Sequence, residues 1–258
     1  MGDNRQNVTM DSFDGVAWIR IDRPERKNAV DSTTRHELAD AFEAAGGDDD
    51  VRVIVLSGTG GSFSAGVDLN ETSSSQGHPL ARDQEPLVAP VERCPKPVIA
   101  AIDGPAIGGG FEFALAADMR VATPRSFFAL TELHIGSLPG SGGTQRLFSA
   151  LPSAIAWRLL LTGERLDAQR AYEVGLISDL IDVDRFDDAV QDIAANVAAA
   201  APLSLRAAKM AGRAGMDRAG TAGLALERVL WASLASTEDR AEGRSAFREK
   251  RDPEFKGR

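Results

Sequence analysis

A strand that leads through three glycines into an apolar helix constrains the fold more than any other feature of the sequence. Residues 97–102 are apolar throughout apart from their flanks, which predicts a buried strand, and the glycines then open a helix over 109–117. Glu112 is the one carboxylate in that helix, and its neighbours three and four positions on are Leu115 and Ala116. A carboxylate with no polar helix face to join is expected to have a chemical role or a charged partner.

The alternation of strand and helix continues through most of the chain. Further elements are predicted as strands over 16–21, 51–56, 119–123, 127–130 and 177–181, and as helices from an Asp31 cap to Gly47 and from near Thr144. Residues 70–90 contain many helix and strand breakers, which predicts a variable surface segment. From about Ser153 the pattern is mostly helical, and we expect a soft boundary near residue 200 that separates an α/β domain, 1–199, from a helical region, 200–258.

The charge and the cysteine count exclude several classes of function. A net charge of −9 opposes attraction to nucleic acid or anionic lipid, so neither is an expected partner. The single cysteine, Cys94, excludes an internal disulfide and fits a reducing compartment. No apolar run approaches the roughly 18 residues of a membrane span, and the polar first residues show no secretory signal. We therefore expect a cytoplasmic protein.

Several familiar catalytic patterns are missing from the sequence. The glycines at 104–110 match neither the dinucleotide fingerprint nor the Walker A loop. His36, His78 and His134 do not have the spacing of metal ligands, so we expect no metal. No serine lies in the pattern that serine hydrolases of the α/β class require.

The same glycine-rich turn can serve chemistry of another kind. Backbone N–H groups in the first turn of a helix have no acceptor within the helix, so they can stabilise a developing oxyanion. Gly109 offers such a donor, and Ala65, within a loop of small residues at 63–68, is a second candidate. From the residues alone, a tight turn without chemistry is an equally good interpretation.

A second carboxylate, Glu132, can return to the neighbourhood of Glu112. The helix over 109–117 runs out about 13 Å and the strand over 119–123 can return a similar distance, so the two acids can face one cleft. Two such acids suit general acid and base catalysis. The alternatives are that Glu112 pairs with Arg120 or Arg146 and that Glu132 is simply exposed.

Taken together, these segments resemble the enoyl-CoA hydratase/isomerase (crotonase) family from about Val16 to the C-terminus. The motifs that carry the resemblance are residues 23–29, 63–69, 96–101, 108–112, 139–147, 161–165, 168–175 and 242–256. The resemblance implies an α/β fold, a spiral of β-β-α turns with a C-terminal helical region that forms trimers. It also implies a homo-oligomer, either a trimer or a hexamer made of two trimers.

The resemblance further implies a site that binds an acyl-CoA substrate. The thioester oxygen would lie between the amides of Ala65 and Gly109, while Glu112 and Glu132 hold a water molecule with help from the amide of Gly140. Coenzyme A is part of the substrate, so no separate cofactor is expected. Contacts to CoA or the acyl chain are implied for Arg26, Lys27, Ala29, Ser64, Gly66, Asp68 and Leu69, and for Phe255 and Lys256 of a neighbouring subunit.

Three positions depart from the pattern that is common in the family. Thr131, Phe111 and Glu25 stand where a proline, a cysteine and a basic residue are frequent. The leading interpretation is a 2-enoyl-CoA hydratase that uses both glutamates. A Δ3-Δ2 enoyl-CoA isomerase, which needs one glutamate, and a non-catalytic acyl-CoA or RNA-binding scaffold are the alternatives.

Overall fold

The computed structural model describes residues 6–70, 85–216 and 237–258, together with Val229 and Ser233. The described strands form two sheets, one in the order β1-β2-β3-β4-β6-β9 and a smaller one in the order β5-β7-β8. The strands of the main sheet are β1 (Val8–Phe13), β2 (Val16–Ile21), β3 (Val53–Gly58), β4 (Val98–Ile102), β6 (Met119–Ala122) and β9 (Asp179–Leu180). Those of the smaller sheet are β5 (Pro105–Ile107), β7 (Phe127–Ala129) and β8 (Leu166–Asp167). All neighbours pair in parallel except β1 with β2 and β7 with β8.

Helices follow the strands in turn and account for most of the second half of the chain. The α-helices are α1 (Ser32–Gly47), α2 (Ala89–Arg93), α3 (Gly109–Ala116), α4 (Gly143–Ala150), α5 (Ser153–Thr162), α6 (Ala168–Glu173), α7 (Phe186–Ala198), α8 (Pro202–Met216) and α10 (Glu238–Glu249). Short 3-10 helices are η1 (Pro24–Arg26), η3 (Glu132–Ile135) and η4 (Val183–Arg185). The predicted cap of α1 is confirmed, because the Asp31 carboxylate accepts a hydrogen bond from the Thr34 amide at 2.8 Å.

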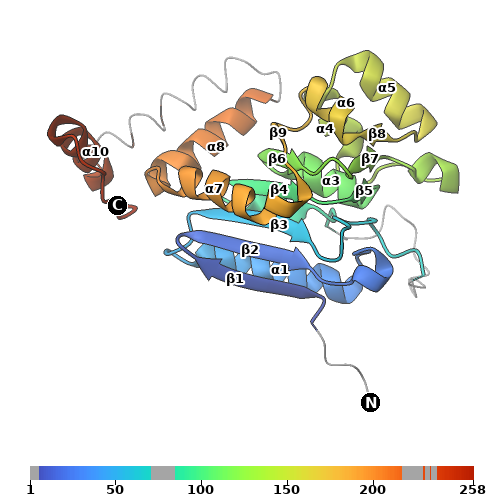
Figure 1. Ribbon diagram of the computed structural model, residues 1–258, viewed down its shortest axis with the longest axis horizontal. Helices are drawn as coiled ribbons and strands as arrows, with labels where there is room; N and C mark the ends of the chain where they lie inside the picture. Colours follow the sequence, from blue (N-terminus) through green and yellow to red (C-terminus); the bar gives the residue numbers. More distant parts are fainter. Residues whose placement is uncertain (1–5, 71–84, 217–228, 230–232, 234–236) are drawn as a thin grey trace.

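Both faces of the main sheet are buried. Along β3, Val53 and Val55 face a cluster that includes α7, whereas Ile54 and Leu56 face the larger core beneath α1 and α3. Figure 1 shows α1 behind β1 and β2, with α7 in front of the sheet. Since the side chains of a strand alternate between faces, a strand that is apolar at every position must be covered on both sides. This accounts for the uninterrupted apolar runs in the sequence.

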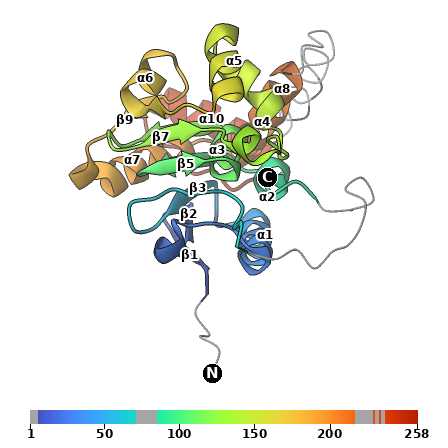
Figure 2. The same cartoon turned by 90° about the vertical axis from the view of Figure 1, so that its right-hand side faces the viewer.

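The chain forms a spiral in which each turn visits both sheets. After β4 the chain enters β5, and after β6 it enters β7, which pairs with β5 through Ala106 and Phe128. Earlier turns continue this second layer through isolated bridges between Ser64 and Ala106 and between Val30 and Val67. Figure 2 shows β5 and β7 stacked above β3 and β2. The expected β-β-α spiral is confirmed.

Three strands were not predicted from the sequence. Strand β8 has only two residues, which are too few to form an alternating pattern. The other two are β1 and β5. In β1 only Val8 is buried, because the strand lies at the edge of the sheet and its other residues face solvent. The short strand β5 lies within the stretch that we interpreted as a turn, since its three residues carry no alternating pattern. Both are cases in which backbone pairing, and not an apolar pattern, creates the strand.

The predicted boundary near residue 200 lies in the turn between α7 and α8. Within the described part of the chain, α8 is attached to the α/β body by an ion pair between Lys209 and Asp118 at 2.7 Å. Residues 71–84 of the predicted variable segment lie outside the described residues. In the ranges that are described, no helix has the length and apolar character needed to cross a bilayer.

Candidate active site

Helix α3 places Glu112 inside the protein, where no charged side chain of the described residues pairs with it. All eight residues of α3 are buried, and Glu112 is 3% exposed. Its Oε1 atom accepts hydrogen bonds from the amides of Ser141 and Gly143, at 2.7 and 2.8 Å. Neither predicted arginine contacts it, because Arg120 donates to backbone carbonyls and Arg146 pairs with another acid. The ion-pair alternative for Glu112 is therefore wrong.

The glycine-rich loop over 139–143 supplies the amides that bind this carboxylate. A side chain at Gly143 would lie 2.9 Å from Glu112 Oε1, so the close approach of the amide requires glycine. Gly143 is also the first residue of α4, where backbone N–H groups have no acceptor within the helix. The helix end therefore acts as a small anion site that is occupied by Glu112.

Glu132 lies at the same end of α3. It is the first residue of η3, and its Oε1 atom is 3.0 Å from the position that a Gly108 side chain would take. Gly108 is the residue that caps α3, so Glu132 lies against the end of the helix that carries Glu112, near enough for the charge of Glu112 to raise its pKa. Glu132 Oε2 is buried and has no hydrogen-bond partner among the described residues. Glu132 is thus not a simple exposed residue.

Burial determines the ionisation of both acids. Burial raises the pKa of Glu112, and the amides of Gly143 and Ser141 offset part of that rise by stabilising the carboxylate. Burial also raises the pKa of Glu132, and the negative charge of Glu112 raises it further. Backbone hydrogen bonds at Glu132 and Thr131 offset part of this rise. The two acids therefore differ in that only the pKa of Glu132 is raised by a neighbouring charge as well as by burial.

The predicted donor Ala65 does not face this site. Its amide donates to the Lys27 carbonyl at 2.9 Å, which joins the loop over 63–69 to the loop before α1. Successive amides of an extended segment point in opposite directions, so the available donors are found at other positions of the loop. The assignment of Ala65 to the oxyanion hole is corrected on this ground.

Val67 provides the amide that Ala65 does not. Its N–H has no acceptor in the part of the chain that the structure describes, and the same is true of the buried Gly109 amide. The Val67 nitrogen lies 3.6 Å from the position that a side chain on Gly109 would take, so the two donors lie side by side. Gly66 between them has φ +81° and approaches Gly109 closely.

The other residues predicted to bind CoA differ in how far they are exposed to solvent. Arg26 and Lys27 are exposed, Ala29 is 8% exposed and Leu69 is 71% exposed. Ser64 is fully buried, and its hydroxyl donates to the Asn28 carbonyl at 2.8 Å. The same hydroxyl accepts a hydrogen bond from the Gly66 amide, so Ser64 stabilises the loop. The prediction that Ser64 contacts the ligand is corrected on this ground.

Asp68 also has a structural partner. Its carboxylate pairs with Arg23 at 3.3 Å, and Arg23 pairs in addition with Asp31 at 2.9 Å. The side chain of Asn28 donates to the carbonyls of Thr59 and Ser62, at 2.9 and 2.6 Å. These contacts fix the loop that carries Arg26 and Lys27 beside the loop that carries Val67.

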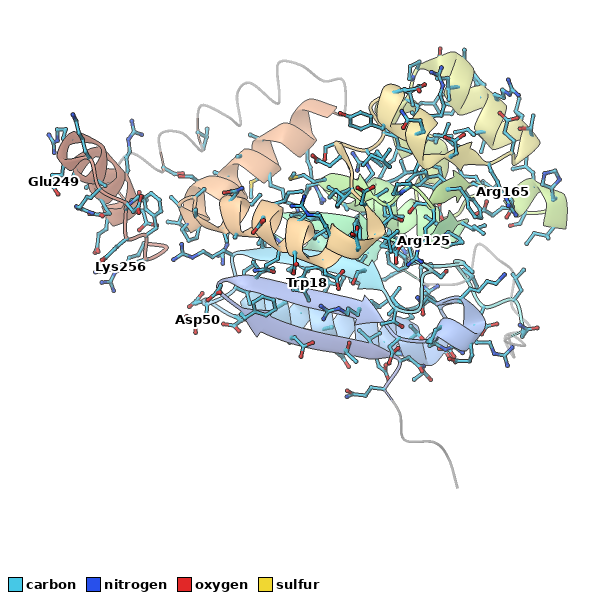
Figure 3. The ribbon with its side chains drawn as sticks, in the orientation of Figure 1. Trp18, Asp50, Arg125, Arg165, Glu249 and Lys256 are labelled. Carbon is cyan, nitrogen blue, oxygen red and sulfur yellow. The ribbon has the colours of Figure 1, made fainter. Side chains whose placement is uncertain are left out.

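Phe255 and Lys256 lie far from the two glutamates within one chain. The Phe255 carbonyl accepts a hydrogen bond from Arg52, which precedes β3, whereas the loop with Val67 follows β3. The six residues of β3 span about 20 Å. Figure 3 shows Lys256 beside α10, at the opposite end of the molecule from Arg125 and Arg165. Any contact of Lys256 with the ligand must therefore come from another subunit.

Gly140 is exposed and lies in the loop whose amides bind Glu112. Its amide has no acceptor in the ranges described, whereas the next amide along, that of Ser141, is used by Glu112. Among the residues whose positions are described, no group of three or more His, Cys, Asp or Glu side chains is arranged to hold a metal ion.

Sequence reasoning missed the amides of Val67, Ser141 and Gly143. The glycines that open α4 were a signal for an anion at that helix end, but nothing in the local sequence identifies Glu112 as the anion. For Val67 there was no local signal, because neighbouring amides of one loop differ only in direction.

Comparison with known proteins gives one consistent result. The sequence profile described as enoyl-CoA hydratase/isomerase matches residues 11–258. The chain is 39% identical to (E)-benzylidenesuccinyl-CoA hydratase of Thauera aromatica, over 97% of this chain and 99% of the relative. It is 41% identical to 2,3-dehydroadipyl-CoA hydratase of Escherichia coli, over 94% and 96%. The crystal structure of an enoyl-CoA hydratase from Mycobacterium tuberculosis superposes with a TM-score of 0.90 at 36% identity, over 98% of this chain and 100% of that one.

Proposed function

We propose, since the chain belongs to the enoyl-CoA hydratase/isomerase family, that it catalyses the reversible hydration of 2-enoyl-CoA thioesters to 3-hydroxyacyl-CoA. One observation supports this reaction above all. The buried carboxylate of Glu112 and the half-buried one of Glu132 lie near the start of α3, beside the amides of Val67 and Gly109, which have no acceptor among the described residues. A hydration needs both a base and an acid next to a place where negative charge can accumulate.

The two amides supply the electrostatic part of the reaction. Water adds to C3 of a conjugated thioester only if negative charge can develop on the carbonyl oxygen as an enolate. Val67 and Gly109 donate to that oxygen, and Gly109 does so from the positive end of a helix. Removal of one such donor typically costs about 3 kcal/mol of transition-state stabilisation.

The two carboxylates supply the proton transfers. Glu112, whose carboxylate two amides stabilise, takes a proton from water as the base. Glu132, whose buried Oε2 has no partner among the described residues, gives a proton to C2 as the acid. The exposed amide of Gly140 helps to hold the water molecule. In dehydration the two roles reverse, and a positioned acid or base contributes roughly 10² to 10⁴ in rate.

Binding of CoA involves residues of two subunits in this proposal. The backbone and side chains near Arg26, Lys27 and Ala29 bind the nucleotide end, and Leu69 lies along the pantetheine. Phe255 and Lys256 reach the ligand of a neighbouring subunit, which requires a trimer or a hexamer of two trimers. A cytoplasmic location is part of the same proposal.

The names of the relatives support a narrower class of substrate. Benzylidenesuccinyl and dehydroadipyl groups both derive from dicarboxylic acids, so each thioester has a second carboxylate on its acyl group. We therefore propose that this chain also prefers an unsaturated acyl-CoA with a distal carboxylate over a simple aliphatic one.

A spectrophotometric screen tests the reaction and the substrate class together. The purified protein is mixed with crotonyl-CoA, longer 2-enoyl-CoA thioesters, 2,3-dehydroadipyl-CoA and a 3-enoyl-CoA. The absorbance of the conjugated double bond is followed, which falls on hydration and rises on isomerisation of the 3-enoyl-CoA. We expect turnover, with the highest kcat/KM for the dicarboxylic substrate. A higher kcat/KM for crotonyl-CoA contradicts the substrate class alone. Turnover of 3-enoyl-CoA only indicates the isomerase, and tight binding without any turnover indicates the scaffold.

A further inference from the structure

The loop that holds Glu112 lies between two charged side chains. On one side its amides donate to Glu112, as described above. On the other side Arg146 Nη1 donates to the Ser141 carbonyl at 2.7 Å. The guanidinium fills the space that a side chain on Gly142 would need, and Gly142 has φ +91°. The loop can thus pass between the Glu112 carboxylate and the Arg146 guanidinium only with glycines at 142 and 143.

Helix α2 and the residues just before it hold Arg146 and the loop in this arrangement. Arg146 Nη2 forms an ion pair with the Glu92 carboxylate of α2. The Leu87 amide donates to the Ser141 hydroxyl at 2.9 Å. The side chain of Arg146 is 25% exposed and that of Glu92 is 35% exposed, so the pair is partly shielded from solvent. The loop is therefore held at two points that do not belong to the site itself.

We propose that Arg146, held by Glu92, is a positioning residue that keeps the amides of the 139–143 loop directed at Glu112. Arg146 itself contacts the loop and not the reacting atoms. The proposal rests on the proposed function only where it treats Glu112 as the base. A positioned loop stabilises the carboxylate form of Glu112, so release of the loop must raise the pKa of that carboxyl group.

The charges around Glu112 could act on its ionisation in another way. Glu132 of η3 faces it, Arg120 of β6 contacts the last turn of α3, and Arg213 of α8 donates to the Glu92 carbonyl at 2.6 Å. Arg146 adds a positive charge on α4, but Glu92 neutralises it. A lysine at 146 keeps the charge but loses the planar guanidinium, which reaches Ser141 and Glu92 through two separate nitrogens in a fixed geometry. Arg146→Lys therefore separates positioning from charge.

The pH profile of kcat is the first test. In Arg146→Gln and Arg146→Lys, we expect the acid limb, where Glu112 must lose its proton, to move to higher pH by about one unit. We also expect kcat below that limb to fall about tenfold while KM changes little, because Arg146 does not contact the substrate. Glu92→Gln keeps the arginine and removes its anchor, and it should shift the limb in the same direction by a smaller amount.

The matched control is Arg158→Gln on α5. Arg158 also forms an ion pair, with Glu164 at 2.5 Å, but its side chain is 71% exposed and distant from the loop in the sequence. This variant should keep the wild-type profile. A uniform loss of kcat at all pH values in the Arg146 variants, with no shift of the limb, would indicate a merely structural role and overturn the proposal. A wild-type profile in Arg146→Lys would likewise overturn it in favour of charge.

A second readout does not depend on activity. The infrared band of the protonated Glu112 carboxyl, assigned by its loss in Glu112→Gln, is titrated in the wild type and in the Arg146 and Glu92 variants. We expect the midpoint to rise in the variants. If the protein shows no hydration but the midpoint rises, the proposed function fails and the positioning role holds. If the midpoint is unchanged in every folded variant, the positioning role is overturned whatever the activity.

Discussion

Single glycines allow the two donor loops to touch, and Gly66 combines a close backbone contact with a positive φ. A methyl group there would lie 2.7 Å from the Gly109 nitrogen, and the φ of +81° disfavours any side chain. Gly66→Ala should lower stability by about 1 to 3 kcal/mol and reduce kcat at least tenfold. The control, Gly47→Ala in α1, has nothing within 4 Å and should be neutral or slightly stabilising. Wild-type kinetics in Gly66→Ala would contradict the placing of Val67 beside Gly109.

A second prediction at this scale concerns Glu132, whose buried Oε2 atom has no hydrogen-bond partner among the described residues. Its pKa is raised by burial and by Glu112, so the folded state binds more protons than the unfolded state between the ordinary and the raised pKa. Stability therefore falls as the pH rises through that window. Glu132→Gln should be more stable than the wild type by about 1 kcal/mol at pH 7, and the gain should vanish below roughly pH 4.

Urea denaturation at several pH values measures this effect. Glu173→Gln on α6 is the control, because Arg170 lowers the pKa of the exposed Glu173 carboxylate, and no gain in stability is expected there. An equal gain in stability at pH 4 and pH 7 in Glu132→Gln would show that the charge of Glu132 is not what lowers the stability of the wild type.

The sequence could predict that Glu112 is buried, but not which amides of the loop over 63–69 lack an acceptor among the described residues. Glu112 was identifiable because an apolar helix gives a carboxylate no polar neighbours. Ala65 and Val67 lie two positions apart in one loop, and only the hydrogen bond from Ala65 to Lys27 decides between them. That bond joins segments that are distant in the chain, so no local pattern reports it.

At the scale of elements, Asp118 forms ion pairs with two residues of α8. Asp118 pairs with Lys209 at 2.7 Å and with Arg213 at 3.0 Å, and it also accepts from the Val98 amide at 2.8 Å. The Lys209 side chain is 7% exposed, so Asp118→Ala would leave a buried charge without its partner. We expect a loss of about 3 kcal/mol.

Thermal unfolding at a fixed protein concentration tests this prediction, because association shifts the apparent midpoint. The matched control is Glu238→Ala, which removes the exposed pair with Arg258 and should change stability by less than about 0.5 kcal/mol. Equal effects of the two substitutions would show that α8 is held mainly by its apolar contacts.

Buried apolar strands could be predicted from the sequence, whereas β1, β5 and β8 could not. The runs that became β3 and β4 are apolar because both faces of the sheet are covered. In contrast, β1 is mostly exposed and β5 has three residues, so their hydrogen bonds are made with strands whose positions depend on the whole spiral. The same holds for Glu132, whose place beside α3 depends on the pairing of β7 with β5.

At the scale of the whole molecule, the prediction concerns the shared site. Within one chain Lys256 lies near the start of β3, whereas the loop with Val67 follows the end of that strand. An effect of Lys256→Ala on CoA binding must therefore come from a neighbouring subunit. We expect the KM for crotonyl-CoA to rise several-fold and the KM for crotonyl-pantetheine, which lacks the phosphates, to stay the same. Sedimentation should give a mass about three or six times the 27.4 kDa of one chain. A monomer, or an equal rise of KM for both thioesters, would contradict the shared site.

Comparison of Glu112→Gln with Glu132→Gln tests the central claim most directly. The measurement is kcat/KM for hydration of crotonyl-CoA and for turnover of 3-enoyl-CoA, in variants shown by circular dichroism to be folded. If both carboxylates act on one water molecule, each substitution lowers hydration by roughly 10² to 10⁴. If either variant hydrates crotonyl-CoA at the wild-type rate, the two-acid account is wrong.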